Sequence, residues 1–367
     1  MHEDRPSTAP DFLLSRATGS VRTQGARKTF TSAETAVDAL HRGEAEMVVG
    51  AIPFDSDTPA ALTVPESIIR EDGPLEPHAF YRNQTLNSRV VGFDPEPEEH
   101  LRRVEAAIGT IETSKLEKVV LARAVDIEFA SPIDPRLVAA RLIDLSVNRD
   151  GFIADLSPAG RPGAMLVGSS PEVLIKRQGS TVSAFPLAGS TPRRANKAAD
   201  HIASQDLLHS AKDLLEHSFV VEHLRTVLEP LCSSLDIPET PQLIHTNEMW
   251  HLGTPVTGTL RDKDLTALEL AEVVHPTPAI CGTPTEAAQA LIETAETDRG
   301  FYAGTVGWCD SSGDGEYMVA IRCAEVAGDG LSARAWAGGG VVGASNAQAE
   351  LEETTAKLQT ILRALSL

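Results

Sequence analysis

Three consecutive strands are predicted in residues 301–341, which read FYAGTVGWCDSSGDGEYMVAIRCAEVAGDGLSARAWAGGGV. The expected strands are 301–309, 316–326 and 331–341. Between them, SGDG at 312–315 and GDG at 328–330 supply the residues that tight hairpin turns require. The stretch therefore predicts an antiparallel meander.

The segments around this meander predict further strands and several helices. Strands are expected at 47–52, 118–129, 164–169, 172–177 and 181–187, the last three as hairpin strands. Helices are expected at 32–41, up to 113, and at 135–147, 195–231, 265–274, 284–296 and 346–365. Thr283 is the expected N-cap of the helix that Pro284 opens. Single strands and single helices do not alternate regularly, so the pattern favours an α+β fold over a doubly wound parallel one.

The net charge argues against two classes of partner. The 367 residues include 52 acidic and 32 basic side chains, a formal charge of −20. The mean electrostatic field therefore repels nucleic-acid phosphates and anionic lipid headgroups, and neither is an expected partner. An anionic small substrate remains compatible with this charge, because a buried cation or a metal ion can dominate the field inside one cleft.

Cysteine usage and the N-terminus favour a cytoplasmic protein. The four cysteines, at positions 232, 281, 309 and 323, form no C-x-x-C pair. The first residues, MHEDRP, lack the apolar region of a signal peptide. We find no apolar run of the roughly 18 residues that a membrane span needs, so no membrane association is expected.

One face of the predicted 195–231 helix carries a carboxylate among apolar residues. Residues three or four apart share a face of a helix. This face holds His209, Lys212/Asp213, Glu216, Val220, Leu224, Val227 and Leu231. Glu216 is therefore expected to point towards the interior. Alternatively the stripe is wide and Glu216 lies at its solvent-facing margin, and periodicity alone does not decide between the two.

The C-terminal helix brings Glu350, Glu353 and Lys357 onto one face with Ile361. Together, Glu353 and Glu216 could form a site of hard oxygen ligands for Mg²⁺, which typically takes one or two carboxylates and completes its shell with waters and substrate oxygens. The alternative is a solvated face, on which the Glu353–Lys357 pair contributes only ~0.3–0.5 kcal/mol.

Three further charged residues lie in or beside apolar strands. Lys118 precedes VVLA, Glu172 follows SSP, and Arg322 separates VAI from CA. A charge buried in a strand needs a partner, and the planar guanidinium of Arg322 suits a carboxylate. The alternative for each is an edge-strand position that faces water. By default His251 is a structural histidine, and GGG at 338–340 permits close backbone approach to a ligand, although a bulge would use the same residues.

Ten segments, taken in order, resemble the chorismate-utilising enzyme family, and within it the isochorismate synthases. They are KVVLAR (118–123), GSSPE (168–172), PLAGS (186–190), KDLLEH (212–217), WHLGTP (250–255), HPTPAICGTP (275–284), GTVGW (304–308), IRCA (321–324), AGGG (337–340) and ELEE (350–353). Their common order and spacing make this resemblance specific. The first ~100 residues resemble the family only loosely.

The resemblance implies a single α+β domain over residues 1–367, with two curved, mainly antiparallel sheets flanked by helices and an active site in a deep cleft. Residues 1–100 are its loosely matching part and residues 101–367 its catalytic part. The implied cofactor is Mg²⁺ and the implied substrate is chorismate. In the family reaction, water adds at C2 of the cyclohexadiene ring as the C4 hydroxyl leaves, which gives isochorismate.

The resemblance also implies catalytic and metal-binding roles. Lys118 matches the general base that activates water, and Glu172 matches the general acid that protonates the departing hydroxyl. Glu216 and Glu353 match the Mg²⁺ ligands, with Glu350 acting through a metal-bound water. In this scheme the metal ion holds the ring carboxylate of the substrate.

The remaining candidates match substrate-binding positions of the family. These are Gly189, His251, Ala279, Tyr302, Arg322, Gly338, Gly339 and Lys357, together with the backbone at 338–340. Among them, Arg322 and Tyr302 match the groups that hold the enolpyruvyl carboxylate.

These roles require opposite pKa shifts in the base and the acid. A lysine base must be neutral near pH 7 although its pKa is ordinarily ~10.4, and burial beside a divalent cation disfavours the ammonium. The Glu172 acid must stay protonated near pH 7 although its pKa is ordinarily ~4.3, so it needs apolar or anionic surroundings.

Lysine at position 118 separates this chain from part of the family. The anthranilate branch departs from lysine there, so water is the expected nucleophile and no amidotransferase subunit is expected. Salicylate synthases keep the lysine but differ over residues 276–282 and go on to eliminate pyruvate. The sequence at 276–282 in this chain resembles that of isochorismate synthases whose product is used to make 2,3-dihydroxybenzoate siderophores. The alternatives are a salicylate synthase, or an isochorismate synthase that supplies menaquinone synthesis. A monomer is expected.

Two interpretations outside this chemistry explain less of the sequence. A non-catalytic metabolite-binding protein with the same fold would tolerate the loss of Lys118 or Glu172, yet both are present. A Mg²⁺-dependent hydrolase would explain the carboxylates but not the lysine or Arg322.

Overall fold

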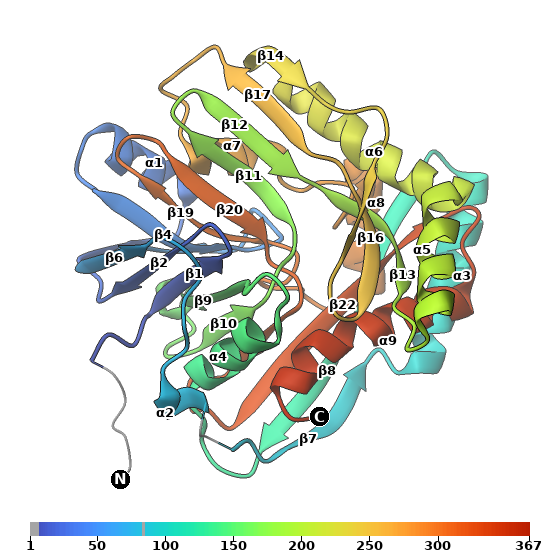
Figure 1. Cartoon of the computed structure of the whole chain (residues 1–367), viewed down its shortest axis with the longest axis horizontal. Coiled ribbons are helices and arrows are strands. Elements are labelled where there is room, and N and C mark those ends of the chain that lie inside the picture. Colours follow the sequence, from blue (N-terminus) through green and yellow to red (C-terminus); the bar gives the residue numbers. More distant parts are fainter. Residues whose placement is uncertain (1–6, 83–84) are drawn as a thin grey trace.

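The computed structural model describes residues 7–82 and 85–367 and confirms the α+β fold (Figure 1). Within this part of the chain, two large sheets and one small sheet are built from antiparallel pairs. The two large sheets agree with the prediction, and the small third sheet adds to it.

The first large sheet has ten strands among the described residues, with β7 paired to β8 beside the main strand path. Its strands in spatial order are β18 (Gly282–Thr283), β8 (Lys118–Phe129), β22 (Ser332–Val342), β21 (Cys323–Val326), β10 (Met165–Gly168), β9 (Gly151–Asp155), β1 (Phe12–Arg16), β2 (Gly19–Gln24) and β6 (Ser67–Glu71), with β7 (Ser88–Asp94) at the side.

The second large sheet has nine strands in the described chain, and the small sheet has three. The second sheet runs β14 (Cys232–Asp236), β17 (Val256–Leu260), β12 (Thr181–Phe185), β11 (Val173–Gln178), β20 (Gly315–Val319), β19 (Thr305–Asp310), β4 (Met47–Ile52), β5 (Ala61–Val64) and β3 (Lys28–Phe30). The small sheet runs β13 (Leu187–Pro192), β16 (Met249–Gly253) and β15 (Gln242–His245).

Helices surround these sheets. They are α1 (Ala33–His41), α2 (Ala79–Arg82), α3 (Pro97–Thr113), α4 (Pro135–Leu145), α5 (Lys197–His209), α6 (Ala211–Leu228), α7 (Ala267–Val274), α8 (Thr285–Ala295) and α9 (Ala347–Ala364), with a short 3₁₀ turn at Ser157–Ala159. In Figure 1, α9 runs alongside β22 and β8, with α3 on its outer side. Among the described residues, no helix is both long enough and apolar enough to cross a membrane.

The ten-stranded sheet is buried on both faces. Along β1, Phe12 and Leu14 join the core between the two large sheets, whereas Leu13 joins a second core beneath α4 and α9. Side chains alternate between the faces of a strand, so a strand covered on both sides reads as an unbroken apolar run.

The predicted three-strand meander is wrong in its middle strand. That strand divides into β20 and β21, which belong to different large sheets. At the crossing, Arg322 has φ +50°, a left-handed conformation that cannot continue a strand. The chain makes a second crossing between β10 and β11, so residues 164–169 and 172–177 are not hairpin partners as expected. The two crossings meet where the Ser169 N–H donates to the Arg322 carbonyl at 3.1 Å.

The predicted 195–231 helix is two helices. Ser210 has extended backbone and ends α5, and its hydroxyl accepts from the Asp213 N–H as the N-cap of α6. The first N–H groups of a helix lack partners within that helix, and the Ser210 hydroxyl provides one for Asp213. Serine at position 210 therefore favours the start of a second helix over the continuation of the first. The predicted N-cap of α8 is also displaced, because Thr283 belongs to β18 and Pro284 occupies the cap position.

Candidate active site

A cavity lies between the large sheets, the small sheet and helices α6 and α9. It is lined by Val120, Pro171, Glu172, Leu187, Ala188, Gly189, Ser190, Glu216, His251, Ala279, Ile280, Tyr302, Ile321, Arg322, Trp336, Ala337, Gly338, Gly340, Glu353 and Lys357. Most residues predicted for the site therefore meet in one place. Lys118, Gly339 and Glu350 stand directly behind this lining.

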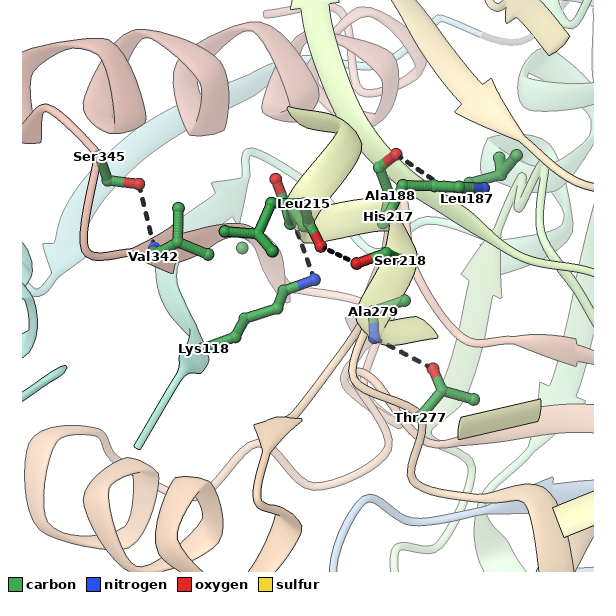
Figure 2. Close-up of polar contacts among 12 residues, drawn as sticks. Lys118, Leu187, Ala188, Leu215, His217, Ser218, Thr277, Ala279, Val342 and Ser345 are labelled. Carbon is green, nitrogen blue, oxygen red and sulfur yellow. Dashed lines mark hydrogen bonds and ion pairs between the residues drawn. The ribbon is translucent and has the colours of Figure 1, made fainter. Parts of the chain in front are cut away.

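Lys118 is fully buried at the start of β8, between β18 and β22, which excludes the alternative of an edge position facing water. Its Nζ lies 3.1 Å from Oε1 of Glu216. Figure 2 shows the Lys118 side chain reaching towards the turn of α6 that carries Leu215 and His217. The inward orientation predicted for Glu216 is confirmed, since the residue is only 8% exposed.

Gly340 makes this ion pair possible. A Cβ atom at position 340 would lie 2.0 Å from Oε1 of Glu216 and 3.0 Å from Cε of Lys118. Any larger residue would thus displace both charged groups. Close approach to the backbone was expected at the 338–340 glycines. At Gly340 the groups that approach the backbone are the side chains of Glu216 and Lys118, not a ligand.

Glu353 and Lys357 form the next charged pair, on α9. Lys357 Nζ donates to Oε1 of Glu353 at 2.6 Å and to the carbonyl of Gly338 at 2.9 Å. The two side chains are only 13% and 18% exposed, so the solvated-face alternative does not hold. Burial opposes ionisation of Glu353, but the charges of Lys357 and Lys212 outweigh it and hold its pKa below the usual value.

Glu350 lies behind the glycine strand rather than in the cavity wall. Its Oε1 accepts from Lys212 Nζ and from the Ser345 hydroxyl, both at 2.8 Å. Its Oε2 is buried and has no hydrogen-bond partner among the residues that the structure describes. Oε2 would lie 3.2 Å from a Cβ at Gly339, which faces α9 and not the cavity. Burial, together with the charge of Glu353, raises the pKa of Glu350 to about 7.

The three glutamates offer the ligand chemistry that a hard divalent cation prefers, but only two of them line the cavity. Glu216 and Glu353 line the same cavity, and the unpartnered Oε2 of Glu350 is an acceptor without a donor. Each glutamate also has a lysine beside it, so the site holds compensating positive charge. No ready-made cluster of three histidine, cysteine or acidic groups is found among the described residues. Carboxylate oxygens are the ligands that Mg²⁺ prefers.

Glu172 stands at the crossing between β10 and β11. Its Oε1 accepts from the Leu187 N–H at 3.3 Å, and its own N–H donates to the Ser170 hydroxyl at 3.2 Å. The residue is only 3% exposed. Burial raises the pKa of Glu172 from 4.5 to about 7, against the opposing effects of the Leu187 N–H and of Lys118, Lys357 and Arg322.

Arg322 stands at the other crossing, also buried. One guanidinium nitrogen faces Nε2 of His251 at 3.2 Å, and the other donates to the Thr360 hydroxyl at 3.2 Å. Burial, with the charges of Arg322 and Lys357, holds the pKa of His251 well below its ordinary value. A neutral His251 can accept the hydrogen bond from Arg322. The histidine therefore contacts another residue that lines the cavity and is not simply part of the apolar core.

The remaining predicted residues shape the cavity wall. The Tyr302 ring stacks on Trp336 at 5.9 Å, and its hydroxyl would lie 2.8 Å from a Cβ at Gly338. Gly189 has φ +78° and leaves room for Asp213 behind it. Ala279 lines the cavity and donates its N–H to the Thr277 hydroxyl at 3.3 Å (Figure 2).

Sequence reasoning missed several contributors. Lys212 was assigned no role, yet it pairs with Glu350. Glu296 and Arg299 form a buried pair that bonds to the backbone of β8 and to the Ile280 carbonyl, next to the cavity. The only local signal was a Glu-x-x-Arg spacing after α8, which is common on protein surfaces. Trp336 gave no signal beyond an aromatic residue in a strand.

Sequence and structure comparisons place this geometry in a known family. Residues 66–366 match the family described as chorismate binding enzyme. A Mycobacterium tuberculosis protein, provisionally named isochorismate synthase MenF, is 44% identical over 97% of this chain and 96% of its own length. Isochorismate synthase DhbC of Bacillus subtilis is 42% identical over 91% of this chain and 84% of its own.

The solved structures agree. The structure from Bacillus anthracis, provisionally described as 2,3-dihydroxybenzoate-specific isochorismate synthase DhbC, matches with a TM-score of 0.90 at 36% identity and covers 99% of this chain and 97% of its own. The chain belongs to the chorismate-binding enzyme family. It is an enzyme of that family, and the three relatives described above are all named as isochorismate synthases.

Proposed function

We propose that the chain is a Mg²⁺-dependent isochorismate synthase, which adds water at C2 of chorismate as the C4 hydroxyl leaves. The observation that carries the proposal is the placement of two buried groups at one cavity: Lys118 lies directly behind its lining, and Glu172, whose pKa burial raises to about 7, lies in the lining itself. In this reaction Lys118 accepts a proton from water, and Glu172 donates one to the departing hydroxyl.

Substrate binding is assigned to the cationic and polar groups of the cavity. Arg322 and the Tyr302 hydroxyl hold the enolpyruvyl carboxylate, since a buried guanidinium can form two parallel bonds to it. The cyclohexadiene ring of the substrate is proposed to lie against Gly189, His251, Ala279, Gly338 and Lys357. Gly339 faces α9 and does not line the cavity, so it is not assigned a contact with the substrate.

Mg²⁺ is assigned to Glu216, Glu353 and Glu350. When bound, the ion supplies positive charge for the ring carboxylate and helps to offset the −20 charge of the chain locally. Because one oxygen of Glu216 faces Lys118, a cation on that carboxylate and an ammonium on the lysine compete for the same negative charge.

Replacing Glu216 or Glu353 with glutamine is expected to weaken Mg²⁺ binding strongly, because a neutral amide is a poor ligand for a hard dication. Calorimetric titration of Mg²⁺ with chorismate present measures this, once any substrate turnover has reached equilibrium. Glu352→Gln, on the exposed side of the same helix, is the matched control. Unchanged affinity in both site variants would remove the metal assignment.

The pathway proposed for the product is 2,3-dihydroxybenzoate siderophore synthesis. The similarity to DhbC proteins supports it, whereas the relative named MenF favours the menaquinone alternative. Disrupting the gene in its own host separates these routes: on the proposal, added 2,3-dihydroxybenzoate restores growth under iron limitation and menaquinone is unaffected.

Three further properties belong to the same proposal. The enzyme works in the cytoplasm, where its four buried, free cysteines would stay reduced. It acts as a monomer, without an amidotransferase subunit, because water and not ammonia is the nucleophile. A salicylate synthase is the alternative activity, and it would release pyruvate from the same substrate.

A further inference from the structure

Arg16 links the N-terminal strand to the loop that carries Glu172. It is the last residue of β1, and its side chain is 17% exposed. One guanidinium nitrogen donates to the Ser170 carbonyl at 3.3 Å and lies 2.9 Å from a carboxylate oxygen of Asp150. Its Nε lies 3.4 Å from a carboxylate oxygen of Glu316. Asp150 directly precedes β9 in one large sheet, and Glu316 lies in β20 of the other, so a single side chain ties both sheets to the crossing.

The Ser169–Ser170 backbone transmits this anchoring to both functional crossings. The Ser169 N–H donates to the Arg322 carbonyl, and the Ser169 hydroxyl donates to the Asp150 carbonyl at 2.8 Å. The Ser170 hydroxyl accepts from the Glu172 N–H two residues later. The hydrogen bond from Arg16 to the Ser170 carbonyl therefore restricts the position of the Glu172 carboxyl group.

We infer that Arg16 is a positioning residue for the Glu172 acid, and this inference rests on the proposed function. It gives the N-terminal part of the chain, which resembles the family only loosely, an indirect part in the reaction. The effect is on geometry, since Arg16 does not line the cavity. Proton transfer to a leaving hydroxyl depends on hydrogen-bond distance, so a small displacement of the acid is costly.

Arginine, rather than lysine, is required at this position. The planar guanidinium offers several donors in fixed directions and contacts a carbonyl and two carboxylates at once. A lysine keeps the positive charge between Asp150 and Glu316, which would otherwise repel each other, but as a point charge it cannot fix all three partners. Arg16→Lys therefore separates the positioning role from simple charge balance.

Arg16→Lys is expected to lower kcat by about 10-fold to 100-fold with little change in KM for chorismate. The matched control is Arg22→Lys on the adjacent strand β2, where a guanidinium of similar exposure pairs with Glu71 away from the crossings. The control is expected to keep wild-type kcat. Thermal unfolding checks that both variants fold. If Arg16→Lys does not fold, Glu316→Gln weakens the same anchor without creating a cavity, although it also removes the 3.7 Å ion-pair partner of the partly exposed Lys176, and it is expected to lower kcat several-fold.

The decisive measurement is a double-mutant cycle. If Arg16 acts through the acid, Arg16→Lys should change kcat by less than about twofold when Glu172 is already glutamine. A fall that persists in full in the Glu172→Gln background overturns the inference, as does wild-type kcat in the folded single variant. If Glu172→Gln alone keeps wild-type kcat, the failure lies instead in the proposed function.

Discussion

Replacing Lys118 with alanine is expected to lower kcat by about 10²–10⁴-fold, while KM for chorismate changes little. General-base catalysis typically contributes this much to a rate, and the lysine stands behind the lining of the cavity rather than among the groups assigned to the carboxylates. Steady-state kinetics at saturating chorismate and Mg²⁺ measures the effect.

Lys115→Ala is the matched control for this experiment, because it removes an exposed lysine just before the same strand. It should leave kcat unchanged. The ion pair with Glu216 also disappears in Lys118→Ala, so circular dichroism and the calorimetric Mg²⁺ affinity are needed to show that the site is otherwise intact. Near-normal isochorismate formation by the folded variant would reassign Lys118 to structure.

Replacing Glu172 with glutamine is expected to lower kcat by a similar factor, because the amide is nearly isosteric but cannot donate an acidic proton. The wild-type enzyme should lose kcat/KM as pH rises through about 7, since only protonated Glu172 can serve as the acid and burial raises its pKa to that value. In Glu172→Gln this alkaline limb should be absent from the residual activity. A limb that persists unchanged would show that another group titrates.

The same substitution has an expected effect on stability. Glu172 has a higher pKa in the folded chain, about 7, than its ordinary 4.5, so the folded state binds its proton more tightly. The group therefore destabilises the fold increasingly as pH rises from 4.5 to 7, and by a constant amount above that. The melting temperature of Glu172→Gln relative to wild type should thus be higher at pH 8 than at pH 4.5. Glu128→Gln, on the protein surface, should show no such difference.

The placement of several candidate site residues could be predicted from sequence because these residues stand in local patterns, whereas their roles came from the family resemblance. Lys118 opens a strand whose bounds the apolar pattern predicted, and the structure has the same bounds. Glu353 and Lys357 share a helix face, where a spacing of four is enough to bring them together. The inward orientation of Glu216 also followed from periodicity, although periodicity alone left a solvent-facing alternative open.

What could not be predicted depends on contacts between distant segments. Strand periodicity does not show which sheet a strand joins, so the division of 316–326 at Arg322 was missed. Strands β14 to β17 were also missed, because each has only four or five residues, too few for a clear alternation of apolar and polar side chains. The role of Arg16 depends on partners more than 130 residues away, as its bond to Ser170 illustrates. No pattern within β1 indicates such contacts.

The most direct test of the central claim is to incubate the purified chain with chorismate, with and without Mg²⁺, and to separate the products by liquid chromatography. We expect that isochorismate forms, that its formation requires Mg²⁺ and stops when a chelator is added, and that no pyruvate is released. Salicylate with an equal amount of pyruvate would establish the alternative activity. Chorismate recovered unchanged from folded protein in the presence of Mg²⁺ would contradict the account.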